Sequence, residues 1–428
     1  MSDEWKAYVS DPRAVCKYGS KCYQKNTDHH DKFKHPPNDS KRKVGHNHNK
    51  KRFSPYTRDA KTHRVVNDDE KVITSPNKDS TSAAADITSQ STSAPPNSYP
   101  ENESKHEISI IIPDQVTYYS NENIDNKMFL DLFLVEMPKD FFKFFECLKQ
   151  EENYEKLLSS VNLQLIGPFE LLMGKLPILN DKELYLVHWR FFYDPPEFQA
   201  VFKTSGKSEY HIGYFRDSPA ESPVFLASSN SAKDCHITPV ASNIFAAVYL
   251  HLENEKGKSP FTALACQRLM DKVKKWAEEY EYPIEKFDAK KRISKCITKT
   301  LHGAGIMVPY NKKTELGYRR LVETDVNLKK LFQKLSITKT KADKDKLLSE
   351  LQPVITYANI AVDECDFGTG LEMGIDLFCS GLKEVEQSAL SCLTSAYSLL
   401  ERPAFEKIIQ AHLKYRRRGP NMSVLSKI

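Results

Sequence analysis

The stretch LYLVHWRFFYDPPEFQAVFKTSGKSEYHIGYFRDSPAESPVFLAS, residues 184–228, decides the fold class of the chain. Four runs in it are rich in β-branched and aromatic residues: LYLVHWRFFY (184–193), EFQAVFK (197–203), EYHIGYFR (209–216) and PVFLAS (223–228). Short turns containing Pro, Gly, Ser or Asp separate these runs, which is the pattern of strands joined as hairpins. We therefore expect an antiparallel sheet in the middle of the chain.

Helical patterns lie on both sides of these strands. Pro138 precedes KDFFKFFECLKQ (139–150), where a proline at the first turn and a wide phenylalanine face predict a helix. After residue 241 the pattern is almost entirely helical, beginning with NIFAAVYLHLENE and TALACQRLMDKVKKWAEEY. Strands bunched between helices favour an α+β fold, with a central antiparallel sheet flanked by helices and a helical C-terminal part.

Composition divides the 428 residues into four regions. Residues 11–37 form a small Cys- and His-containing module. Residues 38–105 are polar, and their second half is rich in Ser, Thr and Pro, so we expect a disordered linker. Residues 106–418 have the apolar content of a globular region, and residues 419–428 are expected to form a tail.

The net charge of +5 is concentrated near the N-terminus. Residues 1–72 carry 17 Lys and Arg against 10 Asp and Glu, whereas the remainder carries 45 against 47. Such an excess suits an anionic polymer. Its densest part, KRKVGHNHNKKR (41–52), predicts a nuclear import signal or a DNA-contacting arm, with a solvated charge run as the alternative.

The chain is expected to stay inside the cell. Asp3 and Glu4 interrupt the N-terminus, and no secretory signal is expected. No run approaches the roughly 18 apolar residues of a membrane span, so no membrane partner is expected. We expect reduced core residues at the seven cysteines beyond residue 100, which are Cys147, Cys235, Cys266, Cys296, Cys365, Cys379 and Cys392.

The strongest local motif is a zinc pattern. Cys16, Cys22, His29 and His35 are arranged as C-x5-C-x6-H-x5-H, and His30 is a less favoured candidate ligand. A segment of fewer than about 40 residues cannot bury enough surface to fold unaided, and a tetrahedral zinc ion would supply the missing free energy. The spacing differs from that of the DNA-reading finger.

This module resembles the poly(ADP-ribose)-binding zinc finger, on the four ligands together with Gly19, Phe33 and Pro36. The resemblance implies that the zinc ligands are the two cysteines with His29 and His35. It also implies that poly(ADP-ribose) is the ligand, held by the residues Arg13, Tyr18, Tyr23 and Lys25. Aromatic rings stack on adenine and basic side chains neutralise phosphate, so the residue types suit that role.

Two segments of the globular region carry groups that suit chemistry or docking. In GYFRD, Arg216 is placed to reach a partner's carboxylate from a solvent-facing loop, or else forms an exposed ion pair. In VDECD, Asp363, Glu364 and Asp366 crowd together. Mutual repulsion raises the pKa of such carboxyl groups and poises one as a general base, but solvated acids at a helix start give the same pattern.

Three motifs resemble the histone PARylation factor family: HIGYFRDSPAESPVFLASS (211–229), LGYRRLVETD (316–325) and ANIAVDECDFGTGLEMGIDLFCSG (358–381). The resemblance implies an accessory factor that docks on the catalytic domain of DNA-damage-activated poly(ADP-ribose) polymerases. There it would complete a composite active site for serine ADP-ribosylation of histones. It implies no activity of the chain by itself, and NAD bound by the polymerase. It also implies a location in the nucleus, at chromatin and DNA-damage sites.

The resemblance also assigns residues. Glu364 would be the general base that takes the serine proton, because a hydroxyl is a poor nucleophile at neutral pH. Asp363 would help to hold the polymerase, and Phe215 with Arg216 would form the aromatic-arginine pair needed for docking. The alternative is a non-catalytic poly(ADP-ribose) reader and DNA-repair scaffold. A free-standing hydrolase is disfavoured, because the His and Cys positions beyond residue 106 show no metal or nucleophile spacing.

Overall fold

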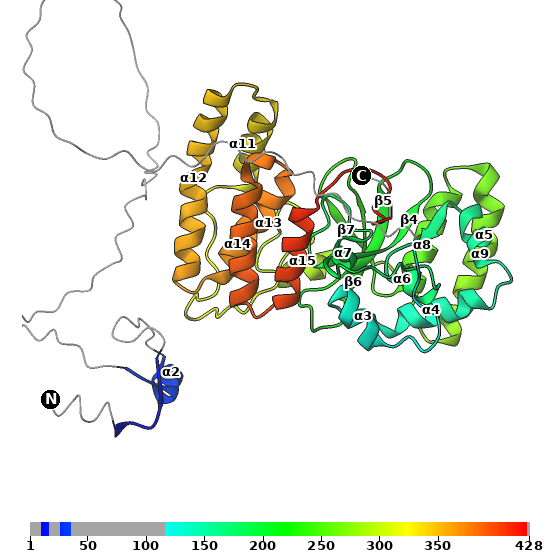
Figure 1. Cartoon of the computed structure of the whole chain (residues 1–428), viewed down its shortest axis with the longest axis horizontal. Helices are drawn as coiled ribbons and strands as arrows, with labels where there is room; N and C mark the ends of the chain where they lie inside the picture. The colour runs from blue at the N-terminus through cyan, green and yellow to red at the C-terminus, as the bar shows by residue number, and fades with distance from the viewer. Residues whose placement is uncertain (1–9, 17–25, 36–115, 426–428) are drawn as a thin grey trace, which may run out of the picture. The chain divides into compact units, whose positions relative to one another are not determined.

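The computed structural model describes residues 10–16, 26–35 and 116–425 (Figure 1). The chain divides into two compact units, Met1–Asn97 and Ser98–Ile428. The linker predicted over residues 38–105 lies outside the described residues. The larger unit has the predicted α+β fold and contains the sheet and the helical C-terminal part (Figure 1).

A five-stranded antiparallel sheet forms the centre of the larger unit. Its strands follow one another in space in chain order: β3 (Leu163–Leu165), β4 (Phe198–Thr204), β5 (Tyr210–Phe215), β6 (Phe225–Asn230) and β7 (Ile237–Ala241). The strands predicted over 197–203, 209–216 and 223–228 are confirmed as β4, β5 and β6. Every residue of β4 is buried, so both faces of the sheet are covered there.

The strand predicted over residues 184–193 is wrong. The segment forms the short helix α7 (Glu183–Val187) and then irregular backbone. Arg190 of this segment donates to the carbonyl oxygens of Leu186, Pro195 and Phe198 at 2.8–2.9 Å and so ties the segment to the start of β4. A short buried apolar run has the same composition whether it is paired in a sheet or held by a buried side chain, so the pattern could not separate the two.

Helices before and after the strands cover the sheet. The predicted helix at 139–150 is confirmed as α4, and its Asp140 accepts hydrogen bonds from the Tyr214 hydroxyl and the Ile244 amide at 3.0 and 2.8 Å. These bonds tie α4 to β5 and to α8. The helices of this part are α3 (Asn126–Phe133), α4 (Lys139–Lys149), α5 (Tyr154–Ser160), α6 (Pro168–Leu172), α8 (Ile244–Lys256), α9 (Pro260–Glu279) and α10 (Ala289–Lys295).

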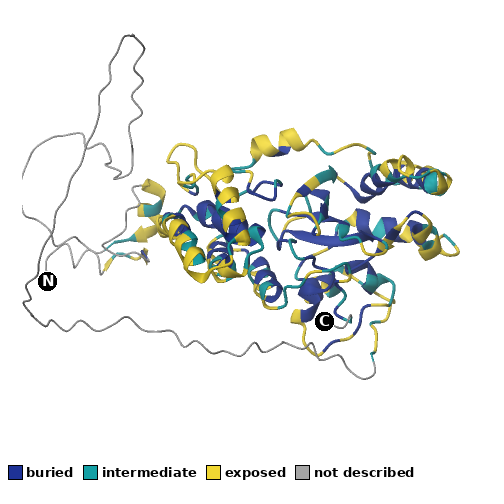
Figure 2. Cartoon of the chain, turned by 90° about the horizontal axis from the view of Figure 1, so that it is seen from above, coloured by how far each residue is buried: buried dark blue, intermediate teal, exposed yellow. Residues whose placement is uncertain are grey.

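The C-terminal part is a helical layer built around α13 (Figure 1). Every residue of α13 from Gly368 to Cys379 is buried, because α12 and α14 pack against it. Figure 2 shows this distribution, with buried residues inside the layers and exposed residues on the outer helix faces. The helices are α11 (Asp325–Ile337), α12 (Lys341–Asp363), α13 (Phe367–Ser380), η2 (Lys383–Val385), α14 (Glu386–Leu399) and α15 (Pro403–Lys414).

The end of the chain is not a free tail over its described part. Met422 and Val424 are each 1% exposed, and the Trp189 amide donates to the Met422 carbonyl at 3.0 Å. Residues 419–425 therefore belong to the globular unit. No described helix has both the length and the apolar character that a membrane crossing needs.

The seven cysteines beyond residue 100 form no disulfide in the described part of the chain, as predicted. Their expected burial holds for Cys147, Cys266, Cys379 and Cys392, whereas Cys235, Cys296 and Cys365 are half-buried.

Candidate functional site

The turn between α12 and α13 presents the crowded acids that the sequence singled out. Helix α12 ends at Asp363, and the Asp366 amide returns to the Ala361 carbonyl at 2.8 Å. Cys365 takes up a left-handed conformation, with φ of 70°, that reverses the chain. Asp363 and Glu364 are exposed in this turn, whereas Asp366 is buried. The turn therefore exposes the carboxylates of Asp363 and Glu364 to solvent and buries that of Asp366.

The segment that follows residue 316 packs directly against this turn. The Gly317 amide donates to Asp366 Oδ1 at 2.8 Å, and the Gly368 amide donates to the Gly317 carbonyl at 2.9 Å. Gly317 has φ of 110°, and a Cβ there would lie 2.1 Å from the Pro309 carbonyl oxygen. Only glycine fits both the conformation and the close approach. These bonds fix the 317–321 segment to the start of α13.

Arg319 joins the two parts of the site. Its Nη2 donates to Glu364 Oε2 and its Nε donates to Asp366 Oδ2, both at 2.5 Å. Its backbone is fixed by the Thr369 hydroxyl, which accepts from the Arg319 amide at 2.9 Å and donates to its carbonyl at 2.7 Å. The guanidinium group therefore starts from an anchored backbone and holds Glu364 in one orientation.

Burial differs sharply among these three charged groups. The side chains of Glu364, Arg319 and Asp366 are 58%, 32% and 6% exposed. Burial lowers the pKa of Arg319, but its bonds to Glu364 and Asp366 outweigh that effect and raise the pKa overall. Glu364 thus faces solvent beside a fixed positive charge. The sequence-based expectation that its main charged neighbours would be other acids is incomplete.

Arg319 is the site residue that sequence reasoning missed. It lies in the LGYRRLVETD motif that was singled out, but 45 residues before Glu364. In the sequence, Arg319 is marked only by its place in an arginine pair, within one of the three motifs that resemble the histone PARylation factor family. A contact across that distance becomes visible only with the fold.

The GYFRD motif does not have the predicted exposure. Phe215 is 1% and Arg216 is 2% exposed, so the expectation of a solvent-facing arginine is wrong. Phe215 stacks on Phe225 with ring centroids 4.9 Å apart. Arg216 donates from Nη2 to the Glu136 carbonyl at 2.9 Å and from Nη1 to the Glu221 carbonyl at 3.2 Å. The arginine ties the β5–β6 loop to the segment before α4, and its role in docking stays a prediction.

The acid of the same motif is also engaged. Both oxygens of Asp217 accept from Arg292, from Nη1 and Nη2 at 2.6 Å each. Burial lowers the pKa of Arg216 to about 10, which leaves its guanidinium charged at neutral pH. Arg216 and Glu364 differ in their surroundings. Arg216 is buried at the end of β5, whereas Glu364 is exposed in the α12–α13 turn.

The smaller unit brings three of the four predicted zinc ligands together. Strand β1 (Ala14–Val15) pairs in parallel with β2 (Phe33–Lys34), and α2 (Thr27–Lys32) lies between them in sequence. Cys16 Sγ lies 3.4 Å from His29 Nε2, which lies 3.1 Å from His35 Nε2. Cys22 lies outside the described residues.

These distances fit zinc. Ligand atoms about 2.0–2.3 Å from a tetrahedral zinc ion stand roughly 3.3–3.7 Å apart, close to the observed separations. The donor set of thiolate and imidazole is also the one that zinc prefers. The cluster contains the imidazoles of His29 and His35, the two histidines of the predicted ligand set.

Arg13 is the one predicted poly(ADP-ribose) residue that the structure describes, because Tyr18, Tyr23 and Lys25 lie outside the described residues. Its guanidinium pairs with Asp11 and donates to the His30 carbonyl. Hydrogen bonding from Arg13 lowers the pKa of Asp11 to about 2. Arg13 is 44% exposed at its side chain, so it supports the finger and still offers a charge to solvent.

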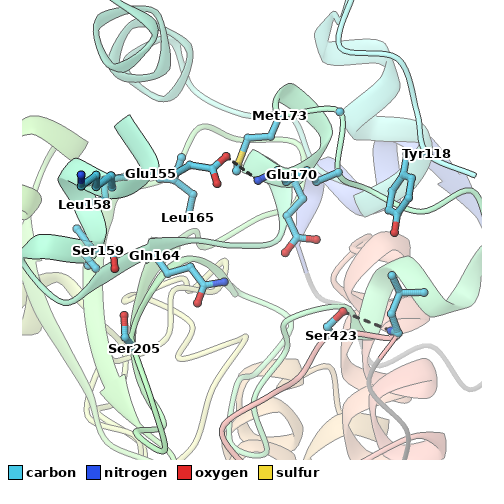
Figure 3. Close-up of a pocket in the computed structure, with 15 residues that line it drawn as sticks. Tyr118, Glu155, Leu158, Ser159, Gln164, Leu165, Glu170, Met173, Ser205 and Ser423 are labelled. Carbon is cyan, nitrogen blue, oxygen red and sulfur yellow. Dashed lines mark hydrogen bonds and ion pairs between the residues drawn. The ribbon is translucent and has the colours of Figure 1, made fainter. Parts of the chain in front are cut away.

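A cavity of about 760 Å³ lies elsewhere, beside α5, β3 and α6 (Figure 3). Glu170 faces it, but its carboxylate already accepts from His188 Nε2 at 2.7 Å and Trp189 Nε1 at 2.5 Å. Lys175 on its wall is paired with Glu155 at 2.6 Å. These charged groups are satisfied within the chain, and the cavity includes neither Glu364 nor Arg319.

Comparison with known families assigns both units. The family model described as Histone PARylation factor 1 matches residues 121–416, and the one described as PBZ domain matches residues 13–38. The first match contains the Glu364 turn and the Arg319 segment. The second contains the four zinc ligands predicted from the sequence.

Curated relatives agree with this assignment. Histone PARylation factor 1 of Danio rerio is 39% identical over 292 residues, covering 67% of this chain and 84% of the relative. The proteins of that name from Bos taurus and Mus musculus are each 38% identical, over 297 and 296 residues. Those alignments cover 66% and 67% of this chain and 84% and 85% of the relatives. The chain therefore belongs to the Histone PARylation factor 1 family and carries a PBZ zinc-finger domain.

Proposed function

We propose that this chain is an accessory factor of a DNA-damage-activated poly(ADP-ribose) polymerase and supplies Glu364 as a general base for serine ADP-ribosylation of histones. The proposal joins the family assignment to one observation. Glu364 is a solvent-facing carboxylate, 58% exposed at its side chain, on a turn whose backbone is fixed by hydrogen bonds. A second protein can cover such a group without unfolding this one.

The chemistry needs a base but not a complete active site from this chain. The serine oxygen forms a bond to the ribose carbon of NAD as the bond to nicotinamide breaks, and the hydroxyl proton passes to a Glu364 oxygen. General base catalysis of this kind contributes typically about 10²–10⁴-fold in rate. In the proposal the polymerase binds NAD, and this chain completes the site from outside.

Arg319 gives the carboxylate its orientation in this scheme. It occupies Glu364 Oε2, so Oε1 remains the oxygen for the serine proton. An arginine keeps its positive charge at neutral pH, so a fixed cation stands beside the Glu364 carboxylate. Glu364 is 58% exposed at its side chain, so a docking partner can reach the carboxylate from the solvent side.

The zinc finger adds a separate binding function. We propose that zinc held by Cys16, Cys22, His29 and His35 orders the finger to bind poly(ADP-ribose), the product of the same reaction. Arg13 would then offer its charge to phosphate with Tyr18, Tyr23 and Lys25. This activity keeps the protein at sites where polymer has been made, and it does not require Glu364.

The test compares Glu364→Gln with the control Glu350→Gln, an exposed glutamate on helix α12, which ends just before Glu364. Each variant is mixed with the polymerase, damaged DNA, NAD and a histone peptide, and both polymerase affinity and serine modification are measured. We expect Glu364→Gln to bind with at most a few-fold change in affinity and to lose about 10²-fold or more of the serine rate. Undiminished serine modification would overturn the assignment.

The reader-and-scaffold alternative predicts different results. In it, Glu364→Gln is silent, and Cys16→Ser alone prevents recruitment to damaged chromatin. We also propose nuclear localisation, directed by the basic cluster at residues 41–52. Deleting that cluster and imaging a fluorescent fusion tests this, since unchanged nuclear accumulation would exclude it as the import signal.

A further inference from the structure

A second group of carboxylates lies beneath the Arg319 segment. Glu372 and Asp376 are one turn apart on the buried helix α13 and are 4% and 0% exposed. Asp325, exposed at the first position of α11, brings a third carboxylate to them. One oxygen from each of the three lies within 4.8 Å of the others. Three carboxyl groups thus meet at one point, two of them away from water.

Each buried carboxylate has one satisfied oxygen and one unsatisfied oxygen. Glu372 Oε1 accepts from the Thr298 hydroxyl at 2.6 Å, and Asp376 Oδ1 accepts from the Leu301 amide at 2.8 Å. Glu372 Oε2 and Asp376 Oδ2 are buried without a hydrogen-bond partner among the described residues. Leaving buried polar atoms in this state is costly, so each of these two oxygens calls for a proton, a water or an ion beside it.

The charges around the cluster do not compensate it. Burial raises the pKa of Glu372 and the charge of Asp325 adds to that effect, whereas hydrogen bonds from Thr298 and Tyr318 and the charge of Arg320 lower it. Burial also raises the pKa of Asp376, and Glu372 and Asp325 add to that effect. The carboxylates therefore repel one another and lack a cation that pairs with them directly within the described part of the chain.

Carboxylate oxygens at this spacing suit a hard divalent cation. Magnesium and calcium take oxygen ligands at about 2.0–2.6 Å, so ligand oxygens around one ion stand roughly 3–5 Å apart. The hydroxyl groups of Thr298 and Tyr318 beside Glu372 add further oxygen donors. Asp325 is exposed, which gives an ion a route from solvent.

We propose that Asp325, Glu372 and Asp376 bind one hard divalent cation, which fixes the segment that carries Arg319. Tyr318 and Asp325 stand on either side of Arg319 in the chain, and both reach this cluster, so a bound ion would hold the segment at two points. The binding of the ion does not depend on the proposed role of Glu364. Only its effect on catalysis rests on that role.

The test uses Mn²⁺ as the probe on the full-length, zinc-loaded protein, with electron paramagnetic resonance to count bound ions and calorimetry to measure affinity. We expect about one bound Mn²⁺ per chain, displaced by Mg²⁺ or Ca²⁺, and a higher melting temperature on saturation. Glu372→Gln and Asp376→Asn should lower affinity by at least the 10–100-fold that the loss of a supporting residue typically costs.

Two further variants keep the result interpretable. Asp325→Asn removes the exposed ligand without disturbing the buried helix, and it should weaken Mn²⁺ binding even if the α13 variants fold poorly. Glu364→Gln and Glu350→Gln should bind Mn²⁺ as the unmodified chain does. Absence of a bound ion at millimolar Mn²⁺, or affinity unchanged in Asp325→Asn and Glu372→Gln, would overturn the site, with hydration or protonation of the acids as the remaining explanation.

Discussion

Arg319→Ala should lower stability mainly through Asp366 and not through Glu364. The substitution removes the hydrogen bond to each carboxylate, but Asp366 is 6% exposed at its side chain and Glu364 is 58% exposed. A buried charged acceptor left without its partner costs about 1–3 kcal/mol or more, whereas an exposed ion pair contributes about 0–1 kcal/mol. We expect Arg319→Ala to lower the free energy of unfolding by about 2–3 kcal/mol.

Urea unfolding of the full chain measures this, with Arg268→Ala as a matched control on the exposed surface of α9. Glu364→Ala should lose no more than about 1 kcal/mol, and the double variant Arg319→Ala/Glu364→Ala should match Arg319→Ala within about 0.5 kcal/mol. A neutral Arg319→Ala, or a Glu364→Ala as damaging as Arg319→Ala, would refute the reasoning that Asp366 anchors the arginine.

Three other predictions concern groups away from this network. Burial lowers the pKa of His302 to about 3, so its contribution to stability is full above pH 6.5 and falls with pH below that. Between pH 7.5 and 5 the free energy of unfolding, measured with urea, should fall by about 2 kcal/mol more in the unmodified chain than in His302→Gln. An equal fall in both proteins would contradict a neutral buried imidazole. Chelating zinc, or the substitution Cys16→Ser, should unfold the finger without shifting the melting transition of the larger unit. A single transition in which both units melt together would contradict this. Arg216→Ala should lower the melting temperature by several degrees, because two carbonyls lose their donor, each worth about 1–3 kcal/mol. Weakened polymerase binding at an unchanged melting temperature would instead make Arg216 a direct docking residue.

The sheet could be predicted where turns punctuate it. Pro, Gly and Ser mark the ends of β4, β5 and β6, so three strands were found close to their true bounds. Residues 184–193 have the same composition, but Arg190 holds their backbone in an irregular path. Burial alone makes such a segment apolar, whichever backbone conformation it adopts.

The site could be predicted only as far as local motifs reach. Glu364 and Asp363 stand out by their crowding and by family resemblance, and their exposure agrees with the proposed role. Arg319 could not be assigned, because its contact with Glu364 depends on the packing of the 317–321 segment on α13. Arg216 was wrongly expected on the surface, since its acceptors are backbone carbonyls that carry no sequence signal.

The identity of the modified amino acid tests the central claim most directly. The activated polymerase, a histone peptide and NAD are incubated with the unmodified chain or with Glu364→Gln, and the product is mapped by mass spectrometry. The account predicts ADP-ribose on serine with the unmodified chain and its near-complete loss with Glu364→Gln, while complex formation persists. Serine-linked product at an equal rate with both proteins would contradict it.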